Sequence, residues 1–227
     1  MTDEQIPITG MTVAIGMPVG KPIPPHTVIS LCHTVQRCTE MGVRCDIIME
    51  VSGVVQMTRD CVLDSFLKGD AQKLFWIDSD MAWSPDDFLR MLAISTKVGV
   101  LAASYPARMD GPLSFYVDYA KDRKIGPFGV QEINGAGLGF TVMDRSIAEE
   151  LAAKAPRVTD TLNEREMAAV FRVDIVDGKR RTEDMAFFAD IRDLGHTVWM
   201  DPSIELGHIG EKQWRGRIMD AFKKQAA

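Results

Sequence analysis

The chain has 227 residues, of which 46% are hydrophobic and 26% charged, and its formal net charge is −6 at pH 7. These values are typical of one soluble globular domain, so we expect residues 1–227 to form a single domain. The acidic balance disfavours a protein that depends on non-specific attraction to nucleic acid. The chain has no apolar stretch of the length that spans a bilayer, and its acidic start does not resemble a secretory signal, so we expect a cytoplasmic location.

Apolar runs alternate with amphipathic stretches through the first hundred residues. The predicted strands are 11–15, 45–49, 74–77 and 98–103, and the predicted helices are 27–41, 57–68 and 85–96. This alternation predicts a parallel sheet covered by helices, with residues 11–103 as a nucleotide-binding half.

The second half of the chain has a different pattern. Glycine and proline shorten the spacing after residue 103, and alternating pieces such as 113–117 indicate antiparallel strands. The later predictions are strands at 140–143, 197–200 and 204–206, helices at 145–154 and 183–193, a mobile loop at 155–181, and a basic C-terminal helix at 215–227. The predicted fold is therefore α/β, with a mixed, mostly parallel central sheet flanked by helices and antiparallel additions in the C-terminal half.

Two carboxylates, Asp78 and Asp80, directly follow the predicted strand at 74–77. Ligands of open α/β sheets bind beyond the carboxyl ends of strands. Alternate side chains of an extended segment point to one side, so both acids could meet one hard cation. The alternative is a polar turn that caps the next helix, but Ser84 and Pro85 already supply that helix start.

Two glycine-rich stretches fail the tests for nucleotide-binding motifs. The loop from Gly16 to Lys21 has only three residues between its glycines, and Pro22 follows the lysine, so it is not a P-loop. The stretch 134–139 precedes a strand rather than a helix and has the wrong spacing for a dinucleotide fingerprint. Its glycines indicate either a close backbone approach to a ligand or a bulged turn.

Three features occur in a fixed order along the chain: Asp78-Ser79-Asp80, then Glu183-Asp184 at a helix start, then His208 followed by Gly210 and Lys212. Together they resemble the GT-A glycosyltransferases, in which an Asp-x-Asp motif at a strand end holds a divalent ion and, through it, the diphosphate of a nucleotide sugar. The resemblance runs from Val13 to Trp214 and includes Gly139-Phe140 in the centre. It implies that residues 104–214 form an acceptor and catalytic half.

The resemblance implies a metal site. Asp80 would be a direct ligand, Asp78 a ligand or a contact to the ribose and metal-bound water, and His208 a later ligand. An imidazole beside oxygen ligands favours Mn²⁺ over Mg²⁺. The alternative for His208 is an ordinary surface or core histidine.

The resemblance also implies a general base. Asp184 is the expected base that takes the acceptor's proton, with Glu183 as the alternative or as an acceptor contact. Retaining members of this fold share the metal site without the base, so inversion is an inference from this pair. The alternative is that both acids only favour the helix N-terminus.

The remaining implied contacts fall into two groups. The expected nucleotide-sugar contacts are Gly16, Met17, Pro18, Arg59, Asp78, Ser79, Gly210 and Lys212. The expected contacts on the acceptor and sugar side are Gly137, Leu138, Glu183 and Trp214. Related enzymes often carry Asn after the arginine on the second helix, and here Asp60 follows Arg59.

The sequence therefore predicts a metal-dependent glycosyltransferase that uses a UDP-sugar, or as second expectation a GDP-sugar. The acceptor is a glycan, a protein or a modified nucleic-acid base, and the oligomeric state is left open. The alternatives are a sugar-nucleotide nucleotidyltransferase, or a non-catalytic module that binds nucleotide sugars or carbohydrates.

Overall fold

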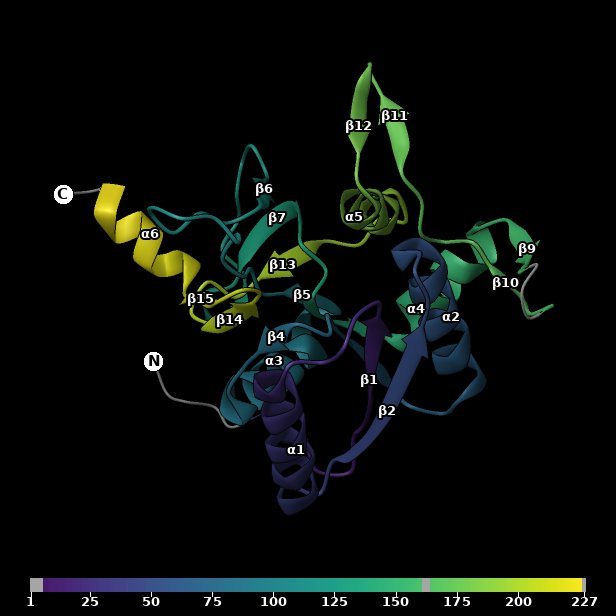
Figure 1. Cartoon of the computed structure of the whole chain (residues 1–227), viewed down its shortest axis with the longest axis horizontal. Coiled ribbons are helices and arrows are strands. Elements are labelled where there is room, and N and C mark those ends of the chain that lie inside the picture. The colour runs from purple at the N-terminus through teal and green to yellow at the C-terminus, as the bar shows by residue number, and fades with distance from the viewer. Residues whose placement is uncertain (1–5, 161–163, 226–227) are drawn as a thin grey trace.

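The computed structural model describes residues 6–160 and 164–225, and these form three layers with a mixed sheet in the middle (Figure 1). The sheet has eight strands in the order β2-β1-β3-β8-β5-β13-β7-β6. Their bounds are β1 (Thr12–Val19), β2 (Arg44–Val51), β3 (Lys73–Ile77), β5 (Val100–Ala102), β6 (Val117–Tyr119), β7 (Gln131–Ala136), β8 (Phe140–Asp144) and β13 (Val198–Met200). β7 and β8 run antiparallel to their neighbours and the other six strands share one direction, which confirms the predicted fold class.

Helices cover both faces of the sheet (Figure 1). The helices on one face are α1 (Pro25–Glu40) and α3 (Pro85–Val98), and those on the other are α2 (Val55–Lys68), α4 (Arg145–Lys154) and α5 (Glu183–Asp193). Side chains of β3 alternate between these two cores: Phe75 packs with α1 and α3, and Trp76 packs with α2 and α5. A strand buried on both faces needs apolar residues throughout, which explains the continuous apolar run.

The helix ends follow their local sequence. Ser84 accepts a hydrogen bond from the backbone N–H of Asp86 at 3.2 Å and so caps α3, with Pro85 in the first turn. Gly42 follows α1 with a φ of 69°, a conformation that glycine adopts without steric cost.

The first strand is longer than predicted. β1 continues beyond residue 15 to Val19, because residues 16–19 pair in parallel with 48–51 of β2. The expected loop therefore begins at Gly20.

The strand expected at 113–117 forms later, as β6, and Phe115 makes only an isolated bridge with Pro106.

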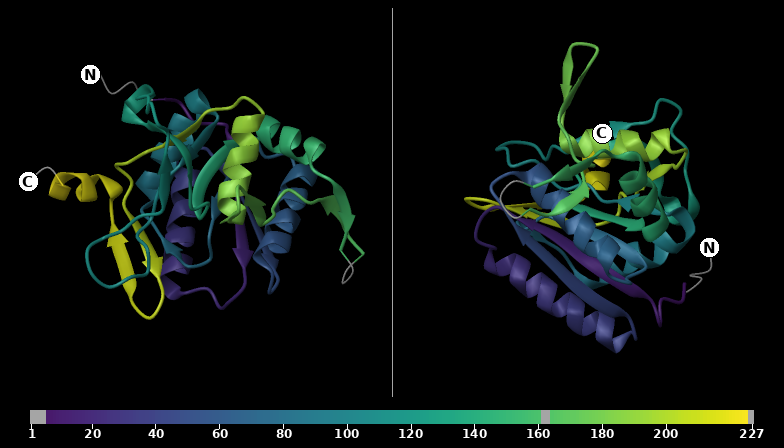
Figure 2. Two further views of the ribbon diagram at one scale, coloured as in Figure 1. Left: turned by 90° about the horizontal axis from the view of Figure 1, so that it is seen from above. Right: turned by 90° about the vertical axis from the view of Figure 1, so that its right-hand side faces the viewer.

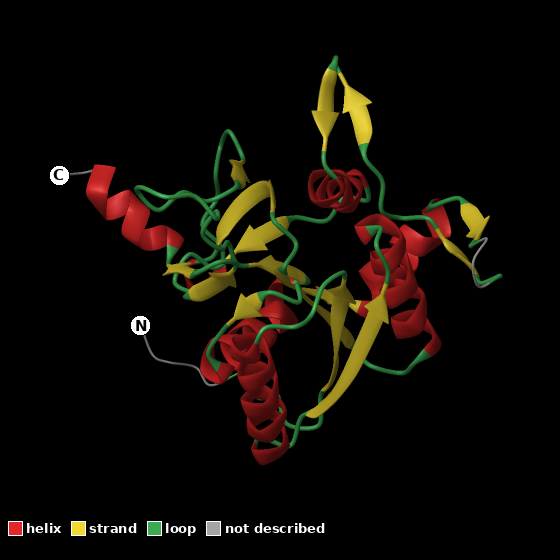
Figure 3. Cartoon of the chain, viewed as in Figure 1, coloured by secondary structure: helices red, strands yellow, loops and turns green. Residues whose placement is uncertain are grey.

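The prediction of a loop at 155–181 was wrong, because the described part of this segment contains two β-hairpins. Residues 161–163 lie outside the described residues. The hairpins are β9 (Arg157–Thr159) with β10 (Glu166–Ala168), and β11 (Asp174–Val176) with β12 (Lys179–Arg181). Strands of three residues are too short to show an alternating pattern. The second hairpin stands clear of the body (Figure 3), and its turn residues Asp177 and Gly178 have φ values of 51° and 74°, as a two-residue hairpin turn requires.

A small sheet at the C-terminal end brings distant segments together. It has the order β15-β14-β4, with β4 at Met81–Ala82, β14 at Leu206–Ile209 and β15 at Gln213–Gly216. Arg215 pairs with Gly207 in this sheet, so helix α6 (Ile218–Gln225) begins three residues later than the predicted helix at 215–227. The short 3₁₀ helix η1 (Pro127–Gly129) precedes β7. Among the described residues, none of the helices combines the length and the apolar character that crossing a membrane requires.

Asp60 of α2 is a buried carboxylate that holds a distant segment. Its side chain is 6% exposed, and its Oδ1 accepts the backbone N–H groups of Val170 at 2.8 Å and Phe171 at 3.0 Å. Burial raises the pKa of Asp60 to about 7. The folded protein thus retains this proton up to a higher pH than the unfolded chain does, so the stabilisation from this group is lost as pH rises from about 4 to about 7.

An Asp60→Asn variant should remove this pH dependence, because the amide oxygen can still accept both N–H groups. Between pH 5 and pH 8 the wild type should lose about 2–3 kcal/mol of unfolding free energy through Asp60, and the variant should not. Urea unfolding at the two pH values measures both, with the exposed Asp122→Asn as control. An equal loss of stability in the wild type and in the Asp60→Asn variant would contradict the assignment.

Candidate active site

The carboxyl end of β3 delivers the two acids to a turn. All five residues of β3 are buried, and Asp78-Ser79-Asp80 then turns, with the backbone N–H of Met81 bonded to the carbonyl of Asp78 at 3.2 Å. Because the segment turns, the alternation of an extended strand does not apply to it. The two carboxylates have different partners: Asp78 accepts a hydrogen bond from Arg59 at 3.1 Å, and Asp80 pairs with Arg108.

Arg59 joins the acids of two distant elements. Its side chain on α2 is 3% exposed and contacts Asp78, Asp184 and, at 3.7 Å, Glu183. Burial disfavours its charge, but the nearby Asp184 and Asp78 raise its pKa above the usual range, so the guanidinium is a fixed cation. Arg59 therefore holds the turn after β3 against the first residues of α5.

His208 reaches Asp80 through the small sheet. The antiparallel pairing of His208 with Met81 brings its Nε2 to 3.7 Å from Oδ1 of Asp80. Its Nδ1 lies 2.9 Å from the carbonyl oxygen of Pro106, so Nδ1 carries the proton and Nε2 presents its lone pair. Burial lowers the pKa of His208, which favours the neutral imidazole that metal coordination requires.

Arg108 was missed by the sequence analysis. It lies on the loop after β5, beside the β14–β15 hairpin, and Figure 2 shows this loop in teal next to the yellow hairpin. The two segments are joined: the indole N–H of Trp214 donates to the carbonyl of Met109 at 3.0 Å, and Lys212 pairs with Asp110. The signal for finding Arg108 was its position after a strand end, where sites of this kind form.

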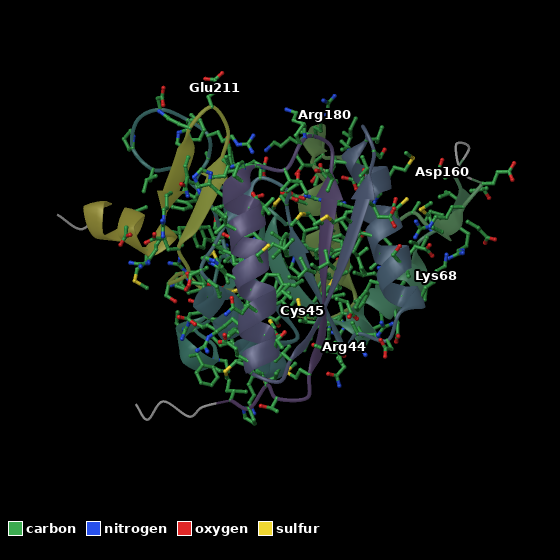
Figure 4. The ribbon with its side chains drawn as sticks, turned by 60° about the horizontal axis from the view of Figure 1, so that its bottom comes forward. Arg44, Cys45, Lys68, Asp160, Arg180 and Glu211 are labelled. Carbon is green, nitrogen blue, oxygen red and sulfur yellow. The ribbon has the colours of Figure 1, made fainter. Side chains whose placement is uncertain are left out.

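A cleft of about 880 Å³ connects these groups. Figure 4 shows Glu211, which lines it, at the tip of the β14–β15 hairpin and far from Arg44 and Cys45, which begin β2. The cleft thus lies at the carboxyl end of the parallel strands. Its ionic lining has five carboxylates and three basic side chains: Asp78, Asp80, Glu183, Asp184 and Glu211 against Lys21, Arg59 and Arg108.

Most of the predicted site residues lie on this cleft. Those that line it are Pro18, Arg59, Asp78, Ser79, Asp80, Glu183, Asp184, His208, Gly210 and Trp214.

Five predicted residues lie elsewhere. Gly16 and Met17 are buried inside β1, where a Cβ on Gly16 would meet Val62 at 2.6 Å, and Leu138 is buried in the core. The resemblance implied contacts at Gly16 and Met17 in a loop, but β1 extends through both residues. Lys212 lies over the ring of Trp214 at 5.1 Å, outside the cleft lining, and Gly137 lines a second pocket.

The glycines of the stretch 134–139 accommodate protein side chains. A Cβ at Gly135 would lie 2.9 Å from Met185, one at Gly137 would lie 2.3 Å from the hydroxyl of Tyr105, and one at Gly139 would lie 2.5 Å from a carboxylate oxygen of Asp78. The absence of a side chain at alternate positions therefore lets three site side chains pack against this segment. The pairing of β7 with β6 also shifts by one residue between Ile133 and Gly135, so a bulge occurs here, and Gly137 lines a second pocket.

The side chains around Asp80 fit a divalent cation that takes only some of its ligands from the protein. A carboxylate and a neutral imidazole nitrogen face each other there, and the second imidazole nitrogen is held by a carbonyl, as is usual for metal-binding histidines. Within residues 6–160 and 164–225 no group of three or more His, Cys, Asp and Glu side chains is arranged to hold a metal ion. A cation bound here would thus take its other ligands from a bound molecule and water.

The fold is that of the GT-A type, a glycosyltransferase-like mixed α/β fold. The sequence matches no protein-family model and no curated protein. Among solved structures, the chain is similar to A197 from STIV, with a TM-score of 0.57 and 20% identity, over 92% of this chain and 91% of that one. It is also similar to GalNAc-T7, solved with UDP, GalNAc and Mn²⁺, with a TM-score of 0.50 and 10% identity over 92% of this chain and 45% of that one. The chain thus spans less than half of the GalNAc-T7 structure, and likeness at these identities shows the fold alone.

Proposed function

We propose that the protein is a metal-dependent glycosyltransferase that moves a sugar from a nucleotide diphosphate to an acceptor hydroxyl, with inversion. The observation that carries the proposal is the arrangement of one cleft: Asp80 and His208 lie on it together, and Arg59 ties Asp184 to the same strand end. The GT-A-like fold and the UDP and Mn²⁺ bound by GalNAc-T7 add support.

Charge in the cleft supports a divalent cation. Carboxylates outnumber basic side chains there, so a diphosphate alone would meet net repulsion. Asp80 and His208 would hold the cation, while Asp78, two residues before Asp80, pairs with Arg59. Mn²⁺ suits this mixed nitrogen and oxygen set better than Mg²⁺. When bound, the cation supplies Lewis-acid stabilisation of the leaving diphosphate. Arg108, which pairs with Asp80, is exposed enough to turn toward a phosphate instead.

The nucleotide would bind at the end of β1. Pro18, Val19 and Gly20 line the cleft there, opposite Ser52 and Val55 of the neighbouring segment. A UDP-sugar is the first candidate donor and a GDP-sugar the second.

Asp184 is the proposed base. Arg59 fixes its orientation at the start of α5, and the carboxylate would take a proton from an attacking hydroxyl. Glu183 would contact the acceptor, since it lies on both the cleft and the second pocket.

Nucleotidyl transfer is a second candidate because Lys21 lines the cleft, where it could contact a triphosphate. Incubation with each nucleoside triphosphate and hexose 1-phosphates would then release pyrophosphate.

A screen of UDP-, GDP-, CMP- and dTDP-sugars with Mn²⁺ tests the proposal, with release of the nucleotide as the readout. We expect slow hydrolysis of one donor that stops in EDTA. Pyrophosphate release without donor hydrolysis would favour nucleotidyl transfer, and binding of a donor without turnover would favour a non-catalytic module.

A Gly139→Ala variant should lower donor turnover about 10²-fold, because the new methyl group displaces the Asp78 carboxylate by the order of an ångström. Gly69→Ala is the matched control, since its nearest neighbour, the carbonyl oxygen of Phe66, is at 3.5 Å. Turnover and melting temperature are measured for both. Full turnover in the folded Gly139→Ala variant would show that the position of Asp78 is unimportant.

A further inference from the structure

A second pocket, of about 500 Å³, adjoins the cleft. The two share Tyr105, Glu183 and Asp184, so the first turn of α5 faces both. A molecule in this second pocket would therefore be next to the proposed base, on a different side from the nucleotide contacts at the end of β1.

The wall of the second pocket is largely apolar. Its apolar and aromatic side chains are those of Tyr105, Tyr116, Val117, Ala136 and Met185. Tyr116 is 67% exposed, so its ring is open to a bound molecule. Such a flat aromatic surface packs well against another ring or against C–H groups.

The polar groups of the second pocket are acceptors and hydroxyls. Three carboxylates, those of Asp118, Glu183 and Asp184, lie on it together with the hydroxyl groups of Ser104 and Thr182. None of the described residues that line it is lysine or arginine. A phosphate, sulfate or carboxylate group would therefore face these carboxylates without a basic side chain in the lining, since Arg59 lies behind Glu183 and Asp184 and is paired with them.

We propose that the second pocket binds the acceptor, and that the acceptor is an uncharged sugar residue. A sugar ring presents C–H groups on its faces and hydroxyl donors around its edge, which matches an aromatic wall beside carboxylate acceptors. This inference rests on the proposed function, and it narrows the acceptor to neutral glycans.

The test uses saturation-transfer NMR on the full chain with UDP and the diamagnetic cation Mg²⁺ present. The probes are the methyl glycosides of glucose, galactose and mannose, compared with the 6-phosphates of the same sugars. We expect transfer to at least one methyl glycoside and to none of the phosphates. Tyr116→Ala should weaken glycoside binding roughly three- to tenfold and Tyr116→Phe should restore it. Ile125→Ala is the control, because Ile125 is also 67% exposed and lies outside both pockets.

The same sample tests the acceptor inference and the proposed function separately, since the signals of UDP report binding in the cleft. Absence of transfer to every methyl glycoside while UDP binds overturns the inference and leaves the proposed function standing. A preference for the 6-phosphates, or unchanged glycoside binding in Tyr116→Ala, also overturns it. Glycoside binding that depends on Tyr116 in a protein that does not bind UDP supports the pocket assignment and contradicts the proposed function.

Discussion

An Asp184→Asn variant is expected to transfer sugar about 10²–10⁴-fold more slowly than the wild type, with unchanged donor binding. The amide cannot take the acceptor's proton, but its oxygen can still accept a hydrogen bond from Arg59, so the geometry of the site is retained. Steady-state kinetics should show the loss in kcat rather than in the KM for the donor.

Glu183→Gln is the matched control for this prediction, because Glu183 starts the same helix but lies 3.7 Å from Arg59 and has no closer contact with it. We expect it to raise the KM for the acceptor with a smaller loss in kcat. If Glu183→Gln caused the large loss in kcat and Asp184→Asn did not, the base would be Glu183. If neither variant slowed transfer, the reaction would proceed without a base at this position.

An Asp80→Ala variant should lose cation-dependent donor binding and lower kcat/KM by on the order of 10³-fold, because the cation contributes several kcal/mol to stabilising the leaving diphosphate. The fold should be little affected. Asp80 pairs with Arg108 at a partly exposed position, where such a pair contributes about 0–1 kcal/mol.

Asp110→Ala is the control for Asp80→Ala. Asp110 is an exposed acid on the loop that carries Arg108, and its partner Lys212 lies outside the cleft lining. It should keep most of the activity. An Asp80→Ala variant that binds and uses the donor as the wild type does would exclude Asp80 as a ligand of the cation.

The elements of this fold were predictable where local chemistry alone determines them. Helix α4 follows the predicted bounds of residues 145–154, and α5 follows those of residues 183–193. The order of the strands was not predictable in the same way. β8 inserts between β3 and β5, and that pairing depends on contacts between segments about forty to seventy residues apart.

The site residues divide along the same line. Asp78, Asp80, Asp184 and His208 carry motifs that can be read along the chain, and all four line one cleft. Arg108 belongs to no motif and reaches Asp80 only through the folded loop.

The role of Asp60 depends on its burial, which no sequence motif indicates. Asp60 accepts two backbone N–H groups through one oxygen, as an asparagine at this position could, and burial raises its pKa to about 7. Burial therefore makes Asp60 more similar to an uncharged asparagine than its residue type suggests.

The most direct test of the account is the calorimetric titration of the wild-type protein with UDP, once with Mn²⁺ and once with EDTA. The account predicts binding that is at least about tenfold tighter with Mn²⁺, since Asp80 and His208 would join the diphosphate only through the cation. The same pair of titrations is made with GDP, the second candidate. Equal affinity in Mn²⁺ and EDTA for the nucleotide that binds, or no binding of either nucleotide, would contradict the account.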